Sequence, residues 1–339
     1  MTHQSATTTF QAASSTSFAQ AWRVTRYGGP EVLEPTSFAV PTPPKGEVLI
    51  KIHASAVTRA DGMMRAGTPK FARLFLGLGK PKQDRIGTGI SGVVQAVGTD
   101  VTQFKVGDEI FGETGLRFGG NASHICLPED YMLVHKPAQL SHAEAAGMCD
   151  GPLTSFNFLS QLAQIRPNDK VLILGASGSL GTAAVQIAAA LGAQVTGTCS
   201  TRNTGLVASL GAHHVIDYTD TDFTQDTRQY DVIYDTLGVS NFDDCNPVLT
   251  RTGRYLSPVL GLGLLCAMLR SKFTRKKAQF SATGMLPVKE LRPMMAQILD
   301  LVAQEKLRPV MDRSWPLSDL PEAHSYVETG RKRGNVTVS

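Results

Sequence analysis

The chain has few cysteines, and none of them stands in a spacing that typically forms disulfides or binds metal. Cys126, Cys149, Cys199, Cys245 and Cys266 are odd in number, widely separated and without a Cys-x-x-Cys pair. This usage argues against a disulfide framework and against a zinc finger, and it is typical of a reducing compartment. We therefore expect a cytoplasmic protein whose cysteines are small core or loop residues.

Long apolar runs and one-sided charge are also absent. The net charge of +4 is too small and too dispersed to indicate nucleic-acid binding. Residues 259–269 form an apolar run of about eleven residues, whereas a bilayer span needs about 20, so we expect no stable membrane insertion. A basic cluster from Arg270 to Lys277 follows. A packed or subunit-facing helix with a solvated basic end is favoured there over a membrane-surface patch.

The first 20 residues lack lysine, arginine and the apolar core of a signal peptide. They are rich in Ser, Thr, Ala and Gln, which fits neither a secretory signal nor a typical transit peptide. We expect residues 1–20 to be a disordered N-terminal extension.

An apolar run followed by glycines stands near the middle of the chain. Residues 170–174 are typical of a buried strand, and they lead into the motif Ala176-x-Gly178-x-x-Gly181, where Ala replaces the first glycine of the usual fingerprint. A helix is expected from about Gly178, and residues 194–199 supply a second strand. Glycines in such a turn let a dinucleotide pyrophosphate approach the backbone, and the helix N-terminus points free N–H groups at it. Similar turns also occur without a ligand, so the context carries this prediction.

The end of the second strand lacks the acidic residue that would bind the adenosine ribose of NADH. Residues 199–203 read Cys-Ser-Thr-Arg-Asn. Ser200 and Thr201 can donate hydrogen bonds to a 2′-phosphate, and Arg202 can pair with it as a fixed cation. The sequence therefore predicts NADPH as the cofactor, although Arg202 could also be an ordinary exposed arginine.

The composition changes twice along the chain. Residues 21–150 are dense in Gly, Pro and short β-rich runs, which is typical of a barrel-like β domain. Strands alternate with helical segments over residues 151–284, which predicts a doubly wound parallel α/β sheet. Residues 285–339 should return to pack on the first domain, with helices near 289–305 and 317–328, a strand around Val310 and a final strand from Asn335.

Several ordered motifs resemble the zinc-independent quinone-oxidoreductase branch of the medium-chain dehydrogenase/reductase superfamily. They cover nearly everything after residue 20, and they comprise residues 54–61, 93–98 continuing to 104–108, 140–146, 178–186, 210–218 and 328–336. The resemblance implies a GroES-like β-barrel catalytic domain over 21–150, completed by 285–339, and a Rossmann domain over 151–284. It also implies an active-site cleft between them and hydride transfer from a nicotinamide.

The zinc ligands of related alcohol dehydrogenases are missing from this sequence. The corresponding positions read Val57-Thr58-Arg59-Ala60-Asp61 and Gly87-Thr88-Gly89, without the cysteine and the His-Glu pair. Catalytic zinc needs about three protein donors, so no metal is expected. His53, His124 and His135 lie in the β domain without motif spacing, and packing or surface roles are favoured for them.

The resemblance carries Thr58 and Asp61 over as active-site residues beside the nicotinamide. Asp61 is the better candidate for a polar or acid group, although a capping role at a helix N-terminus is an equal alternative. Tyr27 could also reach the cleft, without local support. The expected cofactor residues are Thr154, Ser177, Gly178, Ser179, Leu180, Ser200, Arg202, Tyr218, Leu237, Gly238, Val259 and Asn335. A solvated charge run explains Arg331 to Arg333 beside Asn335 equally well.

Reduction is the favoured direction of chemistry, because no metal is present to activate an alcohol. The expected activity is NADPH-dependent hydride transfer to a quinone or an α,β-unsaturated carbonyl. An NADPH-binding sensor without turnover and an NADP(H)-dependent alcohol or aldehyde dehydrogenase remain open. The expected partners are a small-molecule substrate and a second copy of the chain, paired near the apolar run 259–269, with no nucleic acid.

Overall fold

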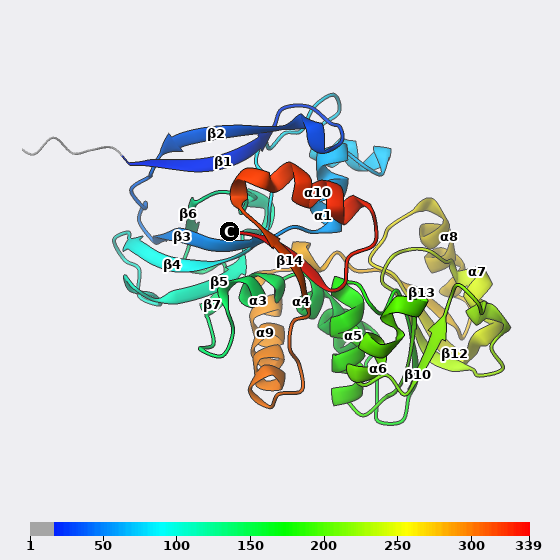
Figure 1. Cartoon of the computed structure of the whole chain (residues 1–339). Coiled ribbons are helices and arrows are strands. Elements are labelled where there is room, and N and C mark those ends of the chain that lie inside the picture. Colours follow the sequence, from blue (N-terminus) through cyan, green and yellow to red (C-terminus); the bar gives the residue numbers. More distant parts are fainter. Residues whose placement is uncertain (1–16) are drawn as a thin grey trace, which may run out of the picture.

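Two β-sheets of different kinds organise the protein in the computed structural model, which describes residues 17–339 (Figure 1). The expected N-terminal extension lies mostly outside the described residues. Its last residues are not an extension, because strand β1 (Phe18–Val24) begins at Phe18 and pairs antiparallel with β2 (Leu33–Ala39). The pairing was missed because the Ser- and Thr-rich residues before it carry no strand signal.

The first sheet joins early strands to the last strands of the chain. It has the order β14-β15-β3-β4-β5-β7, with β6 paired to β3. Alternate residues such as Val48 and Ile50 point into a core that they share with Val94 and Leu127. The strands are β3 (Glu47–Ala56), β4 (Gly89–Val97), β5 (Glu109–Glu113), β6 (His124–Pro128), β7 (Met132–His135), β14 (Met311–Trp315) and β15 (Asn335–Val338). The helices of this part are α1 (Arg59–Ala66), α2 (Arg73–Leu76), α3 (His142–Gly147) and α10 (Leu320–Glu328).

The second sheet consists of parallel strands in the order β10-β9-β8-β11-β12-β13, as the α/β prediction required. The order reverses between β8 and β11, and ligands of such sheets bind at the carboxyl ends of the strands there. The strands are β8 (Lys170–Leu174), β9 (Gln194–Cys199), β10 (His214–Asp217), β11 (Tyr230–Asp235), β12 (Leu249–Leu256) and β13 (Lys277–Gln279). The helices are α4 (Gly151–Phe156), α5 (Ser179–Ala190), α6 (Thr204–Ser209), α7 (Phe242–Cys245), α8 (Leu262–Ser271) and α9 (Val288–Ala303).

The tail of the chain divides between the two parts. Strands β14 and β15 return to the first sheet, as expected, and β15 pairs with β3. Helix α9 follows them only in part. Its apolar face, with Leu291 and Ile298, belongs to a core that contains Phe111 of the first sheet as well as Val171 of the parallel sheet. Arg292 on the same helix donates to the Tyr131 carbonyl (2.8 Å) of the first part. The helix therefore contacts the first domain, as expected, and the parallel-sheet part as well.

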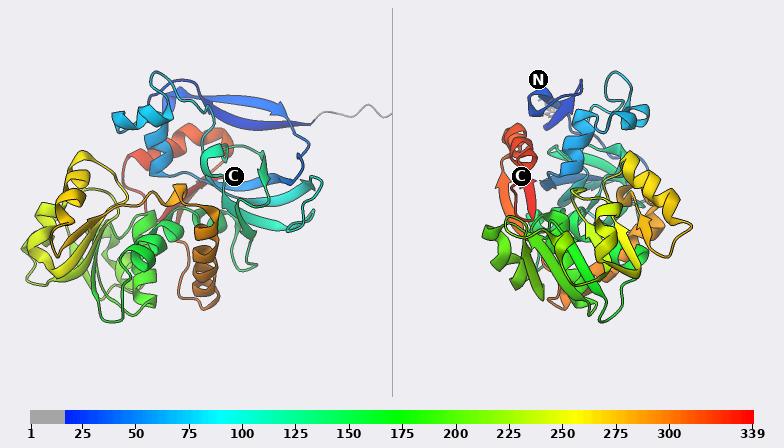
Figure 2. Two further views of the ribbon diagram at one scale, coloured as in Figure 1. Left: turned by 180° about the vertical axis from the view of Figure 1, so that it is seen from behind. Right: turned by 90° about the vertical axis from the view of Figure 1, so that its right-hand side faces the viewer.

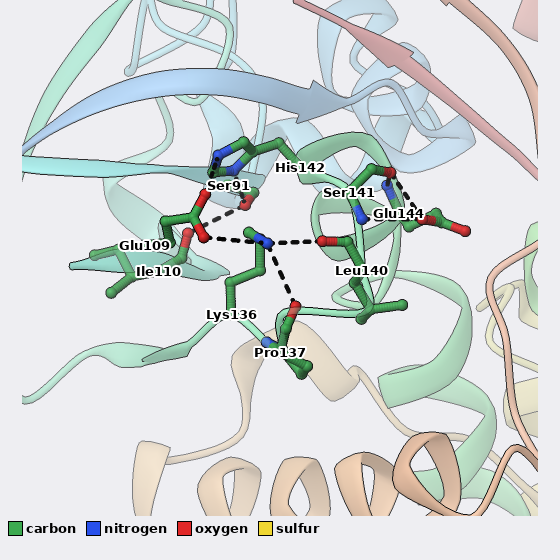
Figure 3. A network of polar contacts seen from close by, with 9 residues as sticks. All are labelled: Ser91, Glu109, Ile110, Lys136, Pro137, Leu140, Ser141, His142 and Glu144. Carbon is green, nitrogen blue, oxygen red and sulfur yellow. Dashed lines mark hydrogen bonds and ion pairs between the residues drawn. The ribbon is translucent and has the colours of Figure 1, made fainter. Parts of the chain in front are cut away.

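A polar network fixes helix α3 to the first sheet (Figure 3). His142 Nδ1 lies 2.8 Å from Ser91 Oγ, and His142 Nε2 lies 3.1 Å from Glu109 Oε1. The contacts resemble a Ser-His-Glu triad, but Ser91 is fully buried and its hydroxyl donates to the Ile110 carbonyl (3.1 Å). The hydroxyl is thus inaccessible to a substrate, and the network has a structural role.

Candidate active site

The turn between β8 and α5 has the geometry of a phosphate-binding turn. Gly175 adopts φ +75°, a left-handed conformation that favours glycine, and Gly178 is the N-cap of α5. A Cβ on Gly181 would lie 2.1 Å from the Gly175 carbonyl oxygen, whereas a Cβ on Gly178 would meet only that oxygen at 3.6 Å. The first glycine of the turn is therefore Gly175, and the sequence motif placed it one residue too late, at the buried Ala176. The space at Gly178 and the free N–H groups of α5 suit a pyrophosphate.

Two of the predicted cofactor residues are held together beside this turn. Asn203 Nδ2 donates to Ser177 Oγ (3.0 Å) and to Ser200 Oγ (3.4 Å). Asn203 Oδ1 is buried without a hydrogen-bond partner among the described residues. Sequence reasoning missed Asn203, although its position next to Arg202 was a usable signal.

Arg202 reaches from this segment to the C-terminal part of the chain. Its guanidinium is exposed, and Nη2 donates to the Arg331 carbonyl oxygen (2.8 Å). Tyr218 follows β10 and is 61 % exposed, while its backbone N–H donates to the Cys199 carbonyl (3.1 Å). Both side chains therefore stand at the edge where the 2′-phosphate was predicted, and both are free of an acidic partner among the described residues.

The segment before β15 crosses the turn at the start of α5. The Gly334 N–H donates to the Ser177 carbonyl (2.9 Å), and Ser179 Oγ lies 2.6 Å from Asn335 Oδ1. The same hydroxyl lies 3.1 Å from Asp150 Oδ2. Asn335 is thus buried against the start of α5 rather than being part of a solvated charge run. It connects the cofactor turn to the first sheet.

Thr58 and Asp61 form a reciprocal capping box at the start of α1. Asp61 Oδ2 accepts from the Thr58 backbone N–H (2.8 Å) and from Thr58 Oγ1 (2.7 Å). Asp61 is fully buried, and its Oδ1 has no partner within the described chain. Burial raises the pKa of Asp61 to about 6, while the Thr58 hydrogen bonds lower it. Asp61 therefore caps helix α1 through Oδ2, while its other carboxylate oxygen, Oδ1, has no hydrogen-bond partner among the described residues.

Two further carboxyl groups surround the same region and were missed by sequence reasoning. Glu113 pairs with Gly89 across β5 and β4, and a Cβ on Gly89 would touch Cys149, which precedes Asp150. Burial, with the nearby Asp150 and Asp61 charges, raises the pKa of Glu113 to about 8. Burial also raises the pKa of Asp150, against the Lys332 charge and the Ser179 hydrogen bond. Glu113 therefore keeps its proton at neutral pH, beside two carboxyl groups whose pKa is also raised.

The carboxyl ends of β11 and β12 bring the remaining predicted residues together. A Cβ on Gly238 would lie 2.7 Å from Val259 Cβ, and a Cβ on Gly175 would lie 2.6 Å from Leu237 Cδ1. Arg59, at the start of α1, donates from Nη1 to the Leu237 carbonyl (2.6 Å) and so connects the two parts of the protein.

Thr154 lies on α4 at the opposite flank of the turn. It is partly exposed, and the neighbouring Ser155 Oγ donates to the Leu180 carbonyl (2.8 Å). Tyr27 is engaged elsewhere, because its hydroxyl donates to the Gly77 carbonyl (2.6 Å) and Arg73 stacks on its ring.

Comparison with known proteins identifies the family. Two family models match, the alcohol dehydrogenase GroES-like domain over residues 44–140 and the zinc-binding dehydrogenase over residues 210–338. The mouse NAD(P)H oxidoreductase RTN4IP1, mitochondrial, is 31 % identical over 361 residues, which cover 94 % of this chain and 88 % of that protein. The chain belongs to the medium-chain dehydrogenase/reductase superfamily.

Relatives within the superfamily carry the name quinone oxidoreductase. The human quinone oxidoreductase is 30 % identical over 321 residues, covering 92 % of this chain and 94 % of that protein. The structure of the quinone oxidoreductase from Coxiella burnetii has a TM-score of 0.82 and 27 % identity, and covers 95 % of this chain and 99 % of that chain. The GroES-like domain and the Rossmann sheet of this superfamily are the two parts described above.

One matching family model bears the description zinc-binding dehydrogenase. Within residues 17–339, no group of three or more His, Cys, Asp or Glu side chains is placed to hold a metal ion. The segment Gly87–Gly89 lies near Asp61, whose pKa the Gly87 backbone lowers slightly, and near Glu113, which pairs with Gly89. Carboxyl groups therefore lie next to residues 87–89, one of the two segments in which the sequence lacks zinc ligands.

Proposed function

We propose that this protein is an NADPH-dependent reductase of quinones or α,β-unsaturated carbonyl compounds that works without zinc. The observation that carries the proposal is the phosphate-binding turn at Gly175 to Gly181 with Ser200 and Arg202 beside it and no acidic residue within residues 199–203, where β9 ends. The names of the relatives, NAD(P)H oxidoreductase and quinone oxidoreductase, support the same reaction class.

The proposed cofactor site has a part for each portion of NADPH. The turn residues and Asn335 bind the pyrophosphate, Ser200, Arg202 and Tyr218 bind the 2′-phosphate and adenine side, and the remaining residues border the adenosine and nicotinamide. The complete proposed set is Thr154, Ser177, Gly178, Ser179, Leu180, Ser200, Arg202, Tyr218, Leu237, Gly238, Val259 and Asn335, to which the structure adds Gly175 and Asn203. When bound, the nicotinamide supplies a hydride to an electrophilic carbon of the acceptor.

The protein's own groups would supply the proton that completes such a reduction. Asp61 and Glu113 are raised in pKa to about 6 and about 8, so Glu113 keeps its proton at neutral pH. Thr58 orients Asp61 through two hydrogen bonds and leaves Oδ1 free. We assign Asp61 and Thr58 to the catalytic site on this ground, with Glu113 as the group best placed to hold a transferable proton.

The proposal extends to the arrangement and setting of the molecule. The catalytic domain comprises residues 21–150 completed by 285–339, and the cofactor domain comprises 151–284. The five cysteines are free thiols, which supports a reducing compartment, taken as the cytoplasm. The mouse relative is named as mitochondrial. No helix within residues 17–339 combines the length and apolarity that a membrane span requires. A homodimer is proposed through the edge strand β13.

The first test follows NADPH oxidation at 340 nm with a panel of quinones, enones and aldehydes. Arg202→Ala removes the cation beside the 2′-phosphate, so KM for NADPH should rise about tenfold to a hundredfold while KM for NADH changes little. Arg251→Ala, an exposed arginine on β12, is the matched control and should behave as wild type.

Each alternative has its own result in this assay. NADPH binding without turnover of any acceptor would replace the reductase with a sensor. Oxidation of alcohols together with tightly held stoichiometric zinc would favour the alcohol dehydrogenase. Equal KM values for NADPH in wild type and Arg202→Ala would remove Arg202 from the phosphate site.

A further inference from the structure

Exposed large apolar side chains concentrate in two short segments of the protein. Of the 15 such side chains within residues 17–339, eight lie in segments 70–82 and 262–277. They are Phe71, Leu74, Phe75, Leu78, Leu262, Leu265, Leu269 and Phe273, with Phe75 78 % and Phe273 92 % exposed. We call these two segments together the apolar-basic surface. Large apolar side chains that gather on a protein surface in this way mark an interaction site.

The charge of the apolar-basic surface is of one sign. Neither segment contains an aspartate or a glutamate, and the exposed cations among them are Lys70, Lys80, Lys82, Lys272 and Arg275, with Arg270 held by Asp243 at 2.7 Å. The overall net charge is only +4, so this concentration is local. A partner that fits must offer both an apolar phase and negative charge.

Helix α8 has apolar side chains on both of its faces. Ala267 and Ser271 are buried, and Leu264 and Met268 pack against the core of the parallel-sheet part. Leu262, Leu265 and Leu269 lie on the opposite face, at the i, i+3, i+7 spacing of one helical stripe. The outward stripe is therefore not needed for folding α8 onto the protein.

The two segments lie at the same end of the molecule. In Figure 1, and in both views of Figure 2, the light-blue segment around α2 and the yellow helix α8 lie toward the same end of the molecule, with a space between their ribbons. Their neighbours are residues of the active site. Val259 precedes α8, and Arg59 at the start of α1 donates to the Leu237 carbonyl between the two parts.

We propose that the apolar-basic surface binds the surface of an anionic lipid bilayer. The leucine and phenylalanine side chains would enter the boundary between headgroups and acyl chains, and the lysine and arginine side chains would contact lipid phosphates. A second copy of this chain is the competing occupant, because the proposed dimer edge β13 begins at Lys277 beside α8; the exposed cations without acidic partners favour the anionic bilayer. Binding is peripheral and reversible, since no described helix can span a bilayer.

Such binding has a consequence for the acceptor. It places Val259, proposed beside the nicotinamide and three residues before α8, close to the lipid, which suits a quinone dissolved in the bilayer. This consequence rests on the proposed function, whereas the lipid binding itself does not.

Cosedimentation with vesicles tests the proposal. The wild-type protein is mixed with vesicles of phosphatidylcholine alone, or of phosphatidylcholine and phosphatidylglycerol at about seven to three, at low and high salt. Binding should be at least about tenfold tighter to the anionic vesicles and should weaken strongly in high salt. Cys266, the exposed cysteine among the five, accepts an environment-sensitive fluorophore whose emission should shift to the blue on binding.

Two double variants distinguish binding through the apolar-basic surface from nonspecific adsorption of exposed apolar side chains. Phe75→Ser with Phe273→Ser should weaken binding to anionic vesicles by about tenfold or more. Val106→Ser with Leu116→Ser removes side chains that are 61 % and 65 % exposed elsewhere, and it should bind as wild type. NADPH oxidation with a water-soluble quinone should be the same in wild type and in both double variants. Failure of the proposed function can therefore be told apart from failure of the lipid-binding proposal.

Three results would overturn the proposal. One is no binding of the wild-type protein to anionic vesicles. The second is equal loss of binding in the two double variants. The third is a sedimentation mass that falls from dimer to monomer in the Phe75→Ser, Phe273→Ser variant, which would assign the surface to a second copy.

Discussion

Asp61 shows how one residue can serve both the fold and the site. One of its carboxylate oxygens completes the capping box of α1 with Thr58, and the other is buried without a partner among the described residues. A buried carboxyl without full compensation binds its proton more tightly, and its pKa rises to about 6. The folded state therefore holds a proton that the unfolded chain releases near pH 4.

This difference predicts a pH dependence of stability. Because the folded pKa is above the unfolded one, the folded state binds more protons, and the unfolding free energy falls as pH rises between about 4 and 6. Between pH 4.5 and 7.5 the loss from this group is about 2 kcal/mol. Asp61→Asn cannot ionise, so urea unfolding at both pH values should show a smaller decline by about that amount.

The matched control for this measurement is Asp130→Asn, which changes an exposed carboxylate and should retain the wild-type decline. An Asp61→Asn variant that loses as much stability as wild type between the two pH values would show that Asp61 ionises normally in the folded protein.

Residue roles were predictable where local sequence determines them, and not where distant segments meet. Ser177, Ser200 and Arg202 lie within three residues of a strand end, so their location beside the turn was predictable, while their binding of the cofactor stays a prediction. Glu113 was missed because its raised pKa depends on Asp150 and Asp61, which the fold brings near it from other elements. No spacing in the sequence signals such a contact.

The glycine turn makes a prediction at the scale of a single element. Gly178→Ala adds a methyl group that meets only one oxygen at 3.6 Å, so the protein should fold with nearly wild-type Tm. The methyl would stand where the pyrophosphate approaches, and KM for NADPH should rise about tenfold or more. Gly181→Ala instead places a Cβ 2.1 Å from the Gly175 carbonyl oxygen. Its Tm should fall by about 5 °C or more.

Thermal unfolding with and without NADPH distinguishes these two variants. Equal Tm values for Gly178→Ala and Gly181→Ala would contradict the steric difference between the two positions. Unchanged KM in a well-folded Gly178→Ala would place the pyrophosphate away from this turn.

Elements were predicted well where their pattern was regular. Strands β8 and β9 appear at their expected residues, because buried strands are continuous apolar runs between turn residues. The short edge strand β13 was not predicted. Helix α9 was expected at nearly the correct residues, but only one of the two parts that it contacts was predicted, since amphipathicity shows that a face is buried and not which neighbours bury it.

The whole molecule is held together by the chain crossing twice between its two sheets. The segment before β15 bonds the cofactor turn through Gly334 and Asn335 and then enters the first sheet, so the two parts share one set of contacts at the site. The edge strand β13 remains at the far end of the parallel sheet, and edges of this kind commonly pair with a second copy. Its Ala278 N–H is already bonded to Ser271 Oγ at 3.1 Å.

The hydrogen bond between Ser271 and Ala278 allows the proposed dimer to be tested by mutation. Wild type should sediment as a dimer of the 36.3 kDa chain at micromolar concentration. Ser271→Ala frees the Ala278 N–H on each copy to bond across the interface. Because a two-fold interface contains this hydrogen bond twice, the dissociation constant of the dimer should fall by about tenfold. Thr274→Ala removes a hydroxyl that bonds only within the chain near α8, and its dimer should match wild type. A monomeric wild type would refute the dimer, and a dimer indifferent to Ser271→Ala would place the interface away from β13.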